Sequence, residues 1–161
     1  MKDRELYIIA HNIRSAHNVG AIFRTCDGAG VTKIYLSGYS QQPALENKEN
    51  KTKPEKMLEK TALGAELSVN WECAEDLSEL IEKLKKSGVT IVALEKTATS
   101  VDIRKFKPSF PMALILGHEV EGVKNTILEI CDAVIDIPMR GQKESLNVSV
   151  ATGIAIYELL G

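Results

Sequence analysis

The stretch DIPMRGQKESLNVSVATGIAIYE, residues 136–158, joins the end of an apolar run to a polar loop and then to a long helical pattern. The run ends at Pro138, and Gly141 in the loop leaves room for a ligand to approach the main chain. Ser145 stands where a helix N-cap is expected, and Asn147 follows closely. The order strand, loop, helix predicts a polar concavity at a helix N-terminus, which suits an anionic or carbonyl-rich ligand.

The helix that follows has almost no charged face. Its first turns carry small and aliphatic residues, namely Val148, Val150, Ala151, Gly153, Ile154, Ala155 and Ile156. A helix of this composition is predicted to be buried on most sides. The local pattern is equally compatible with an ordinary capped core helix, so a ligand site here depends on what other segments contribute.

Alternating apolar runs and helical patterns predict an α/β fold. Strands are expected at 5–10, 33–38, 90–95, 111–117 and 133–138. Helices are expected over 19–26 with Gly30 as C-cap, from Pro54, over 77–84 before Gly88, and within 118–132. The first thirty-eight residues form a βαβ unit, whose crossover requires parallel strands. The sequence therefore predicts five or six parallel strands between two layers of helices.

Composition limits the classes of protein that this chain can belong to. The chain has 161 residues, 44% of them hydrophobic and 26% charged, which fits one compact domain. A net charge of -2 argues against a surface coated in basic residues, so any contact with RNA must be local or helped by a partner.

The cysteines and the N-terminus indicate a cytoplasmic protein. Cys26, Cys73 and Cys131 are odd in number and far apart, which argues for a reducing compartment and against a disulfide framework or a zinc site. No signal-like segment precedes the first strand, and the longest apolar runs fall short of a membrane span.

Polar residues gather after three of the predicted strands. In open parallel sheets ligands bind beyond the carboxyl ends of the strands, so these loops are expected to meet at one edge. They carry Asn12, Arg14, His17, Asn18 and Arg24 after the first strand, Gly117, His118, Glu119 and Gly122 after 111–117, and Arg140, Gly141, Ser145 and Asn147 after 133–138.

Familiar nucleotide and metal motifs are missing from these loops. There is no GxGxxG, no GxxxxGK[ST] and no HExxH, so hydride transfer and phosphoryl transfer lose support and no metal site is expected. The local pattern around Arg24 by itself favours an ordinary surface residue with a snorkelling side chain.

Three separated stretches together resemble a known family. NIRSAHNVGAIFRTCDGAG (12–30), ILGHEVEG (115–122) and IPMRGQKESLNVSVATGIAIYE (137–158) resemble, in order and spacing, the signature motifs of the SpoU (TrmH-like) branch of the SPOUT RNA methyltransferases. The segment KTALGAE (60–66) is also similar to that family. The resemblance covers nearly the whole chain, which is expected to be a single SpoU-type catalytic domain, residues 1–161, without a separate RNA-binding extension.

The resemblance implies a fold, a cofactor and a reaction. The fold is a parallel-sheet three-layer sandwich with a deep trefoil knot at the C-terminus. The cofactor is S-adenosyl-L-methionine, whose methyl group goes to a ribose 2'-hydroxyl of RNA. The resemblance also implies a homodimer that packs through the knotted region and places first-motif residues of one subunit near the cofactor of the other.

Site residues follow from the matched motifs. Arg24 matches a first-motif arginine that handles the RNA phosphate, and because a guanidinium is a very weak base we expect it to be essential without being the proton acceptor. The positions near the catalytic centre are Asn18, Arg24, Glu119, Ser145 and Asn147. The positions expected to hold the cofactor are Leu116, Gly117, Ile137, Met139, Gly141, Ser145, Leu146 and Asn147.

Two departures from the family pattern concern His118 and RNA recognition. His118 stands where many relatives have asparagine. Without a recognition domain, RNA contacts are expected from the catalytic dimer or from an accessory protein. The candidates are Arg14, Arg24, Arg104, Lys105, Lys107 and the segment 48–60, with Arg14 first among those not already implied by the motifs.

The sequence supports one main hypothesis and three alternatives. The main one is an S-adenosylmethionine-dependent 2'-O-methyltransferase acting on tRNA, and rRNA is the close second. A non-catalytic RNA-binding or assembly protein could keep the fold, and a small-molecule methyltransferase would fit the modest charge. The presence of all five motif residues argues against the non-catalytic protein, which would have no chemical need for them. A lack of salt-dependent RNA binding would favour the small-molecule methyltransferase.

Overall fold

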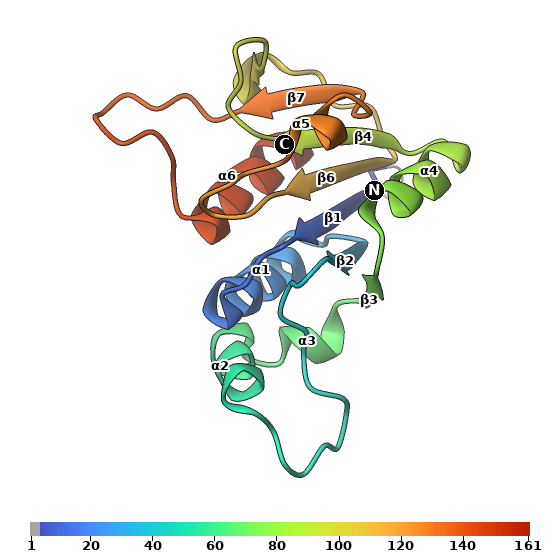
Figure 1. Ribbon diagram of the computed structural model, residues 1–161, viewed down its shortest axis with the longest axis vertical. Coiled ribbons are helices and arrows are strands. Elements are labelled where there is room, and N and C mark those ends of the chain that lie inside the picture. Colours follow the sequence, from blue (N-terminus) through green and yellow to red (C-terminus); the bar gives the residue numbers. More distant parts are fainter. Residues whose placement is uncertain (1–3) are drawn as a thin grey trace.

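The structure, a computed structural model, describes residues 4–161 and contains one seven-stranded parallel sheet (Figure 1). The strand order is β3-β2-β1-β6-β4-β7-β5. The strands are β1 (Leu6–His11), β2 (Lys33–Ser37), β3 (Trp71–Ala74), β4 (Thr90–Leu94), β5 (Val101–Asp102), β6 (Met112–Leu116) and β7 (Ala133–Asp136).

Helices cover both faces of the sheet, which confirms the predicted three layers. They are α1 (Ala16–Ala29), α2 (Lys53–Ala62), α3 (Ala65–Ser68), α4 (Leu77–Lys86), α5 (Asn125–Leu128) and α6 (Val148–Leu160), with a 3-10 turn η1 (Ile103–Lys105). Side chains of α1, α2, α3 and α6 share one core cluster, and those of α4 and α5 share the other. Because successive strand residues point to opposite faces, Ile8 belongs to the first cluster and Ile9 to the second.

The first motif forms α1, whose ends match the sequence prediction. Ser15 caps the helix by accepting a hydrogen bond from the amide of Asn18 at 3.2 Å, and Gly30 ends it with a left-handed φ of 75°. Phe23 and Cys26 on its inner face are fully buried, and burial raises the pKa of the Cys26 thiol. Gly20 lets α2 approach closely, since a Cβ there would lie 2.4 Å from the carbonyl oxygen of Leu58.

Two short edge strands were absent from the sequence prediction. Within the described residues 4–161, β3 pairs only with β2, and β5 pairs only with β7. Their sequences, WECA and VD, lack the apolar runs of the buried strands, because an edge strand needs less apolar surface than a central one. All seven strands nevertheless pair in parallel, as the βαβ pattern predicts.

The last helix differs from its prediction in two ways. Its N-cap is Asn147, not Ser145, because the Oδ1 of Asn147 accepts hydrogen bonds from both the amide and the hydroxyl of Ser149, at 2.9 and 2.6 Å. The helix is also less buried than expected. Val150, Ile154 and Tyr157 keep 51%, 43% and 60% of their surface exposed.

Other sequence predictions concern features beyond the strands and helices. The C-terminal knot stays a prediction. None of the helices in the described part of the chain is both long and apolar enough to cross a membrane. Residues 4–161 contain no group of three or more His, Cys, Asp or Glu side chains arranged to hold a metal ion.

Candidate active site

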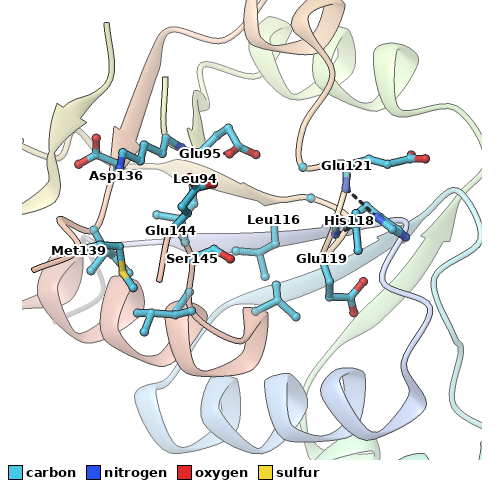
Figure 2. A pocket seen from close by; sticks show the side chains of 18 residues that line it. Leu94, Glu95, Leu116, His118, Glu119, Glu121, Asp136, Met139, Glu144 and Ser145 are labelled. Atoms are coloured by element: carbon cyan, nitrogen blue, oxygen red, sulfur yellow. Dashed lines mark hydrogen bonds between the residues drawn. The ribbon is translucent and has the colours of Figure 1, made fainter. Parts of the chain in front are cut away.

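A cavity of about 360 Å³ lies at the carboxyl ends of the central strands. It is formed by the segments that follow β4, β6 and β7 together with the first turn of α6 (Figure 2). Among the positions that the sequence predicted to hold the cofactor, the cavity is lined by Leu116, Gly117, Ile137, Met139, Ser145 and Leu146. Gly141 and Asn147 are not in its lining.

The loop after β6 is folded tightly around Gly117 and His118. A Cβ at Gly117 would lie 2.6 Å from the carbonyl carbon of Gly122, so only glycine fits there. The His118 carbonyl accepts the Gly122 amide at 2.8 Å. The Nδ1 atom of the His118 ring accepts the amides of Val120 and Glu121 at 3.1 and 2.9 Å (Figure 2). The imidazole therefore stabilises the turn 118–122 by accepting two of its backbone amides.

Glu95, which follows β4, also stabilises this loop by hydrogen bonding, and the sequence did not identify it as a site residue. Its carboxylate accepts the amide of Val123 at 2.9 Å and that of Lys96 at 3.1 Å. A Cβ at Gly122 would lie 2.2 Å from Glu95 Oε2. The available signal was the position of Glu95 at the end of an apolar run, but only the strand order places β4 between β6 and β7.

A chain of hydrogen bonds joins the three motifs at the cavity. The Nδ2 of Asn147 donates to Oδ1 of Asn18, and the Nδ2 of Asn18 donates to Oε1 of Glu119, both at 3.2 Å. Asn18 is 8% exposed, whereas Glu119 and Asn147 are exposed. Within residues 4–161, Glu119 Oε2 accepts no hydrogen bond, which leaves it available to a ligand. The predicted meeting of the three loops at one edge of the sheet is confirmed.

The cavity is rich in negative charge. Glu95, Glu119, Glu121 and Glu144 contribute carboxylates to its lining, as does Asp136, with Lys96 as the only cation in the lining formed by the described residues. Asp136 also accepts a hydrogen bond from the hydroxyl of Ser100 at 2.6 Å. An excess of carboxylates favours a cationic ligand.

The three predicted RNA-contacting arginines lie outside the cavity lining. Arg24 is exposed on α1. Arg14 is exposed and its guanidinium lies over the ring of Tyr39. Arg104 forms a bidentate pair with Asp102, its Nε at 3.0 Å from Oδ1 and its second nitrogen at 2.5 Å from Oδ2. This pair lowers the pKa of the Asp102 carboxyl to about 2.

If the cavity holds the S-adenosylmethionine that the motif resemblance implies, replacing His118 by asparagine is expected to preserve its binding, whereas alanine is expected to weaken it. The Oδ1 of asparagine can accept the same two amides that Nδ1 of His118 accepts, and alanine leaves them to water. We expect the Kd for S-adenosylmethionine to stay within about twofold in His118→Asn and to rise about 3- to 10-fold in His118→Ala. Calorimetry measures both. Equal Kd values for the two variants would contradict this role of the ring.

Comparison with known proteins places the chain in a family. Residues 5–157 match the SpoU rRNA Methylase family. A tRNA (guanosine(18)-2'-O)-methyltransferase of Aquifex aeolicus is 38% identical over 160 residues, which are 98% of this chain and 69% of that protein. A 23S rRNA (guanosine-2'-O-)-methyltransferase RlmB of Xanthomonas axonopodis pv. citri is 32% identical, over 96% of this chain and 58% of the relative.

A solved structure supports the same assignment. An AdoMet-bound rRNA methyltransferase from Sinorhizobium meliloti superposes with a TM-score of 0.85 at 28% identity, covering 98% of this chain and 56% of that one. The chain thus spans only part of the length of these proteins. The match over residues 5–157 and the joining of its three motifs at one cavity establish that this chain belongs to the SpoU family of methylases.

Proposed function

We propose that the protein methylates the 2'-hydroxyl of a ribose in RNA, with S-adenosylmethionine as methyl donor. The observation that carries this proposal is the hydrogen-bonded chain Asn147–Asn18–Glu119, one residue from each motif, beside a cavity of about 360 Å³. A binding protein without chemistry would have no need to bring these three side chains together.

The cavity fits the cofactor in size and in chemical character. The apolar side chains of Leu94, Leu116, Ile137 and Met139 would provide walls for an adenine ring, and Gly117 has no side chain that would block a ligand. The carboxylates in the lining offset the positive charges of a sulfonium and an ammonium group. When bound, S-adenosylmethionine supplies a methyl group that is electrophilic because it is attached to a positively charged sulfur.

The chain's own residues hold the hydroxyl in place. A ribose hydroxyl is a weak nucleophile, so it needs an acceptor for its proton and a fixed orientation. Oε2 of Glu119 is available to accept that hydrogen bond, while Asn18 fixes the other oxygen of the carboxylate. Asn147 in turn fixes Asn18 and is itself held by Ser149 at the start of α6. The three side chains are therefore oriented before the substrate binds.

A homodimer accounts for two features that a single chain leaves unexplained. They are the exposed apolar stripe on α6 and the position of Arg24 outside the cavity lining. Val150, Ile154 and Tyr157 are spaced as i, i+4 and i+7 on α6 and form an exposed apolar stripe, and the neighbouring Ala151 lines the cavity. Tyr157 lies against α1, since a Cβ at Gly28 would be 3.7 Å from its hydroxyl.

Arg24 precedes Gly28 by one turn and so lies on the same side of α1, close to the stripe. A second copy that covers the stripe would bring Arg24 of one subunit toward the cavity of the other. We therefore include in the proposal that Arg24 acts on an RNA phosphate at the partner's site.

tRNA is the proposed substrate class. The Aquifex relative, 38% identical, is named for a tRNA position, and the chain covers a larger share of it than of the rRNA-directed relative. A net charge of -2 also leaves little basic surface for gripping a large RNA.

The test is transfer of labelled methyl to total RNA that lacks its modifications, with tRNA and rRNA fractions counted separately. We expect alkali-resistant label in the tRNA fraction and at least a roughly 100-fold lower rate for Arg24→Ala, because a lost charge contact in the transition state costs several kcal/mol. Lys86→Ala is the control for the loss of a cation and should retain activity, since Lys86 lies on α4 outside the cavity lining and is paired with Glu82.

Three outcomes separate the alternatives. Label confined to rRNA would replace tRNA by rRNA as the substrate class. No label in either fraction, from protein that binds S-adenosylmethionine, would contradict RNA methylation by this chain alone. Full activity of Arg24→Ala would refute the role of Arg24 while leaving the reaction intact.

A further inference from the structure

Tyr39, in the loop after β2, is half exposed although the loop around it is tightly fastened. The residue keeps 49% of its surface exposed. Its amide donates to Oδ1 of Asn12 at 3.1 Å, and the neighbouring Ser40 hydroxyl accepts from the amide of Ile13 at 2.9 Å and donates to the carbonyl of Ala10 at 2.7 Å. These bonds tie the loop after β2 to the loop after β1, which is part of the first motif.

Both loops joined by these hydrogen bonds contain a residue with left-handed backbone angles. Asn12 has a φ of 56° and Gly38 has a φ of 61°. A Cβ at Gly38 would lie only 1.8 Å from Asn12 Oδ1, so the contact with Asn12 requires glycine. Left-handed angles at a residue other than glycine cost about 1 kcal/mol and are concentrated at functional sites. This geometry fixes the point at which the chain presents Tyr39.

A cation and an imidazole flank the Tyr39 ring. The guanidinium carbon of Arg14 lies 5.3 Å from the ring centroid, and the His118 ring lies 6.2 Å away at an angle of 75°. His118 also lines the methyl-transfer cavity, at whose edge it lies in Figure 2. Tyr39 is therefore next to that cavity and outside it. Tyr39 also lines a second cavity of about 540 Å³, to which Gln41 and Gln42 contribute.

We propose that Tyr39 is the surface on which a nucleobase of the substrate RNA stacks while a ribose of that RNA lies at the methyl-transfer cavity. This inference rests on the proposed RNA methylation. Sequence-tolerant binding of unpaired bases uses aromatic side chains and arginine planes, and Arg14 and Tyr39 offer both. The carboxamides of Gln41 and Gln42 carry donors and acceptors that can meet the edge of the base.

Charge supports stacking over electrostatic attraction at this position. The chain has a net charge of -2, and the charged side chains that line the cavity beside Tyr39 are five carboxylates and one lysine. These carboxylates repel phosphates and oppose the attraction from Arg14, so contacts that do not depend on net charge are expected to add to the affinity for RNA near the cavity. A fixed aromatic ring supplies such a contact.

The test compares Tyr39→Phe, which keeps an aromatic face, with Tyr39→Leu, which keeps the bulk without it. For the RNA fraction that the wild type methylates, we expect kcat/KM to fall about 5- to 100-fold in Tyr39→Leu, mostly through KM, and to stay within about twofold in Tyr39→Phe. The Kd for S-adenosylmethionine should be unchanged in both. Equal KM values for the two variants would overturn the proposal.

A binding assay tests stacking independently of methyl transfer. Its probe is a single-stranded oligoribonucleotide of mixed sequence that contains 2-aminopurine, whose fluorescence falls when the base stacks. We expect quenching by the wild type and by Tyr39→Phe and Tyr39→Trp, and little by Tyr39→Leu. Quenching without methyl transfer would refute the proposed reaction and keep the stacking site. Methyl transfer with equal quenching by Tyr39→Leu would refute the stacking site alone.

Discussion

Gly117→Ala is expected to raise the Kd for S-adenosylmethionine roughly 5- to 100-fold, because overpacking a closed site costs about 1–3 kcal/mol. The added Cβ would lie 2.6 and 2.7 Å from the carbonyl carbon and oxygen of Gly122 and 2.7 Å from Val123 Cγ2. Two of these atoms belong to the backbone, so they cannot rotate away. The turn held by His118 and Glu95 must open, and that turn is one wall of the cavity.

Gly141→Ala is the matched control. Gly141 was also predicted to hold the cofactor, but it is exposed, and a Cβ there would meet no heavy atom within 4 Å. We expect its Kd to match that of the wild type. Calorimetry gives both values, and thermal unfolding shows whether Gly117→Ala retains its fold. Wild-type affinity in a folded Gly117→Ala protein would show that the cofactor does not depend on the turn. A similar loss in both variants would mean that the backbone at Gly141, which lies outside the cavity lining, also contacts the cofactor.

The sequence could predict much of the site because parallel strands end at a common edge. Asn18 and Asn147 lie more than a hundred residues apart in the sequence. Each of the three residues nevertheless follows an apolar run closely: Glu119 by two residues, Asn18 by eight and Asn147 by nine. Once the runs are taken as parallel strands, their carboxyl ends must coincide. The hydrogen bonds at 3.2 Å confirm this prediction.

Glu95 could not be predicted in the same way, because its role depends on strand order. Helical and strand periodicity reveals which segments are buried but not which strands are neighbours. In the sheet β4 lies between β6 and β7, and only this order brings the carboxylate of Glu95 to the amide of Val123. The predicted N-cap of α6, Ser145, is wrong for a local reason: serine and asparagine are equally good caps, and Ser145 and Asn147 are two residues apart.

The apolar character of α6 was predicted, but sequence periodicity cannot separate a face buried within one chain from a face buried between two. The face buried within one chain consists of Ala155, Ile156 and Leu159, which lie in the core. Ile154 and Tyr157, on another side of the same helix, remain exposed. The prediction of burial on most sides is wrong for the single chain, and it would be correct for the proposed homodimer.

Ile154→Asp is therefore expected to convert a dimer into a monomer and to abolish methyl transfer. Ile154 is the middle residue of the stripe Val150, Ile154 and Tyr157, and it is 43% exposed in the single chain. A carboxylate placed between two such stripes would lose its water without gaining a partner, which costs several kcal/mol and raises the dimer Kd by about 100-fold or more. Light scattering after gel filtration measures the mass.

Leu67→Asp is the control, because Leu67 on α3 is 74% exposed and lies outside the α6 stripe, so it should leave both mass and activity unchanged. The two measurements test separate steps of the argument. If the Ile154→Asp protein is still a dimer, the α6 stripe is not part of the dimer interface. A monomer with full activity would show that Arg24 of one subunit is not needed at the cavity of the other. A monomer that still binds S-adenosylmethionine but transfers no methyl group is the expected result, because the cavity and the Asn147–Asn18–Glu119 chain lie within one subunit, whereas Arg24 is outside its own cavity.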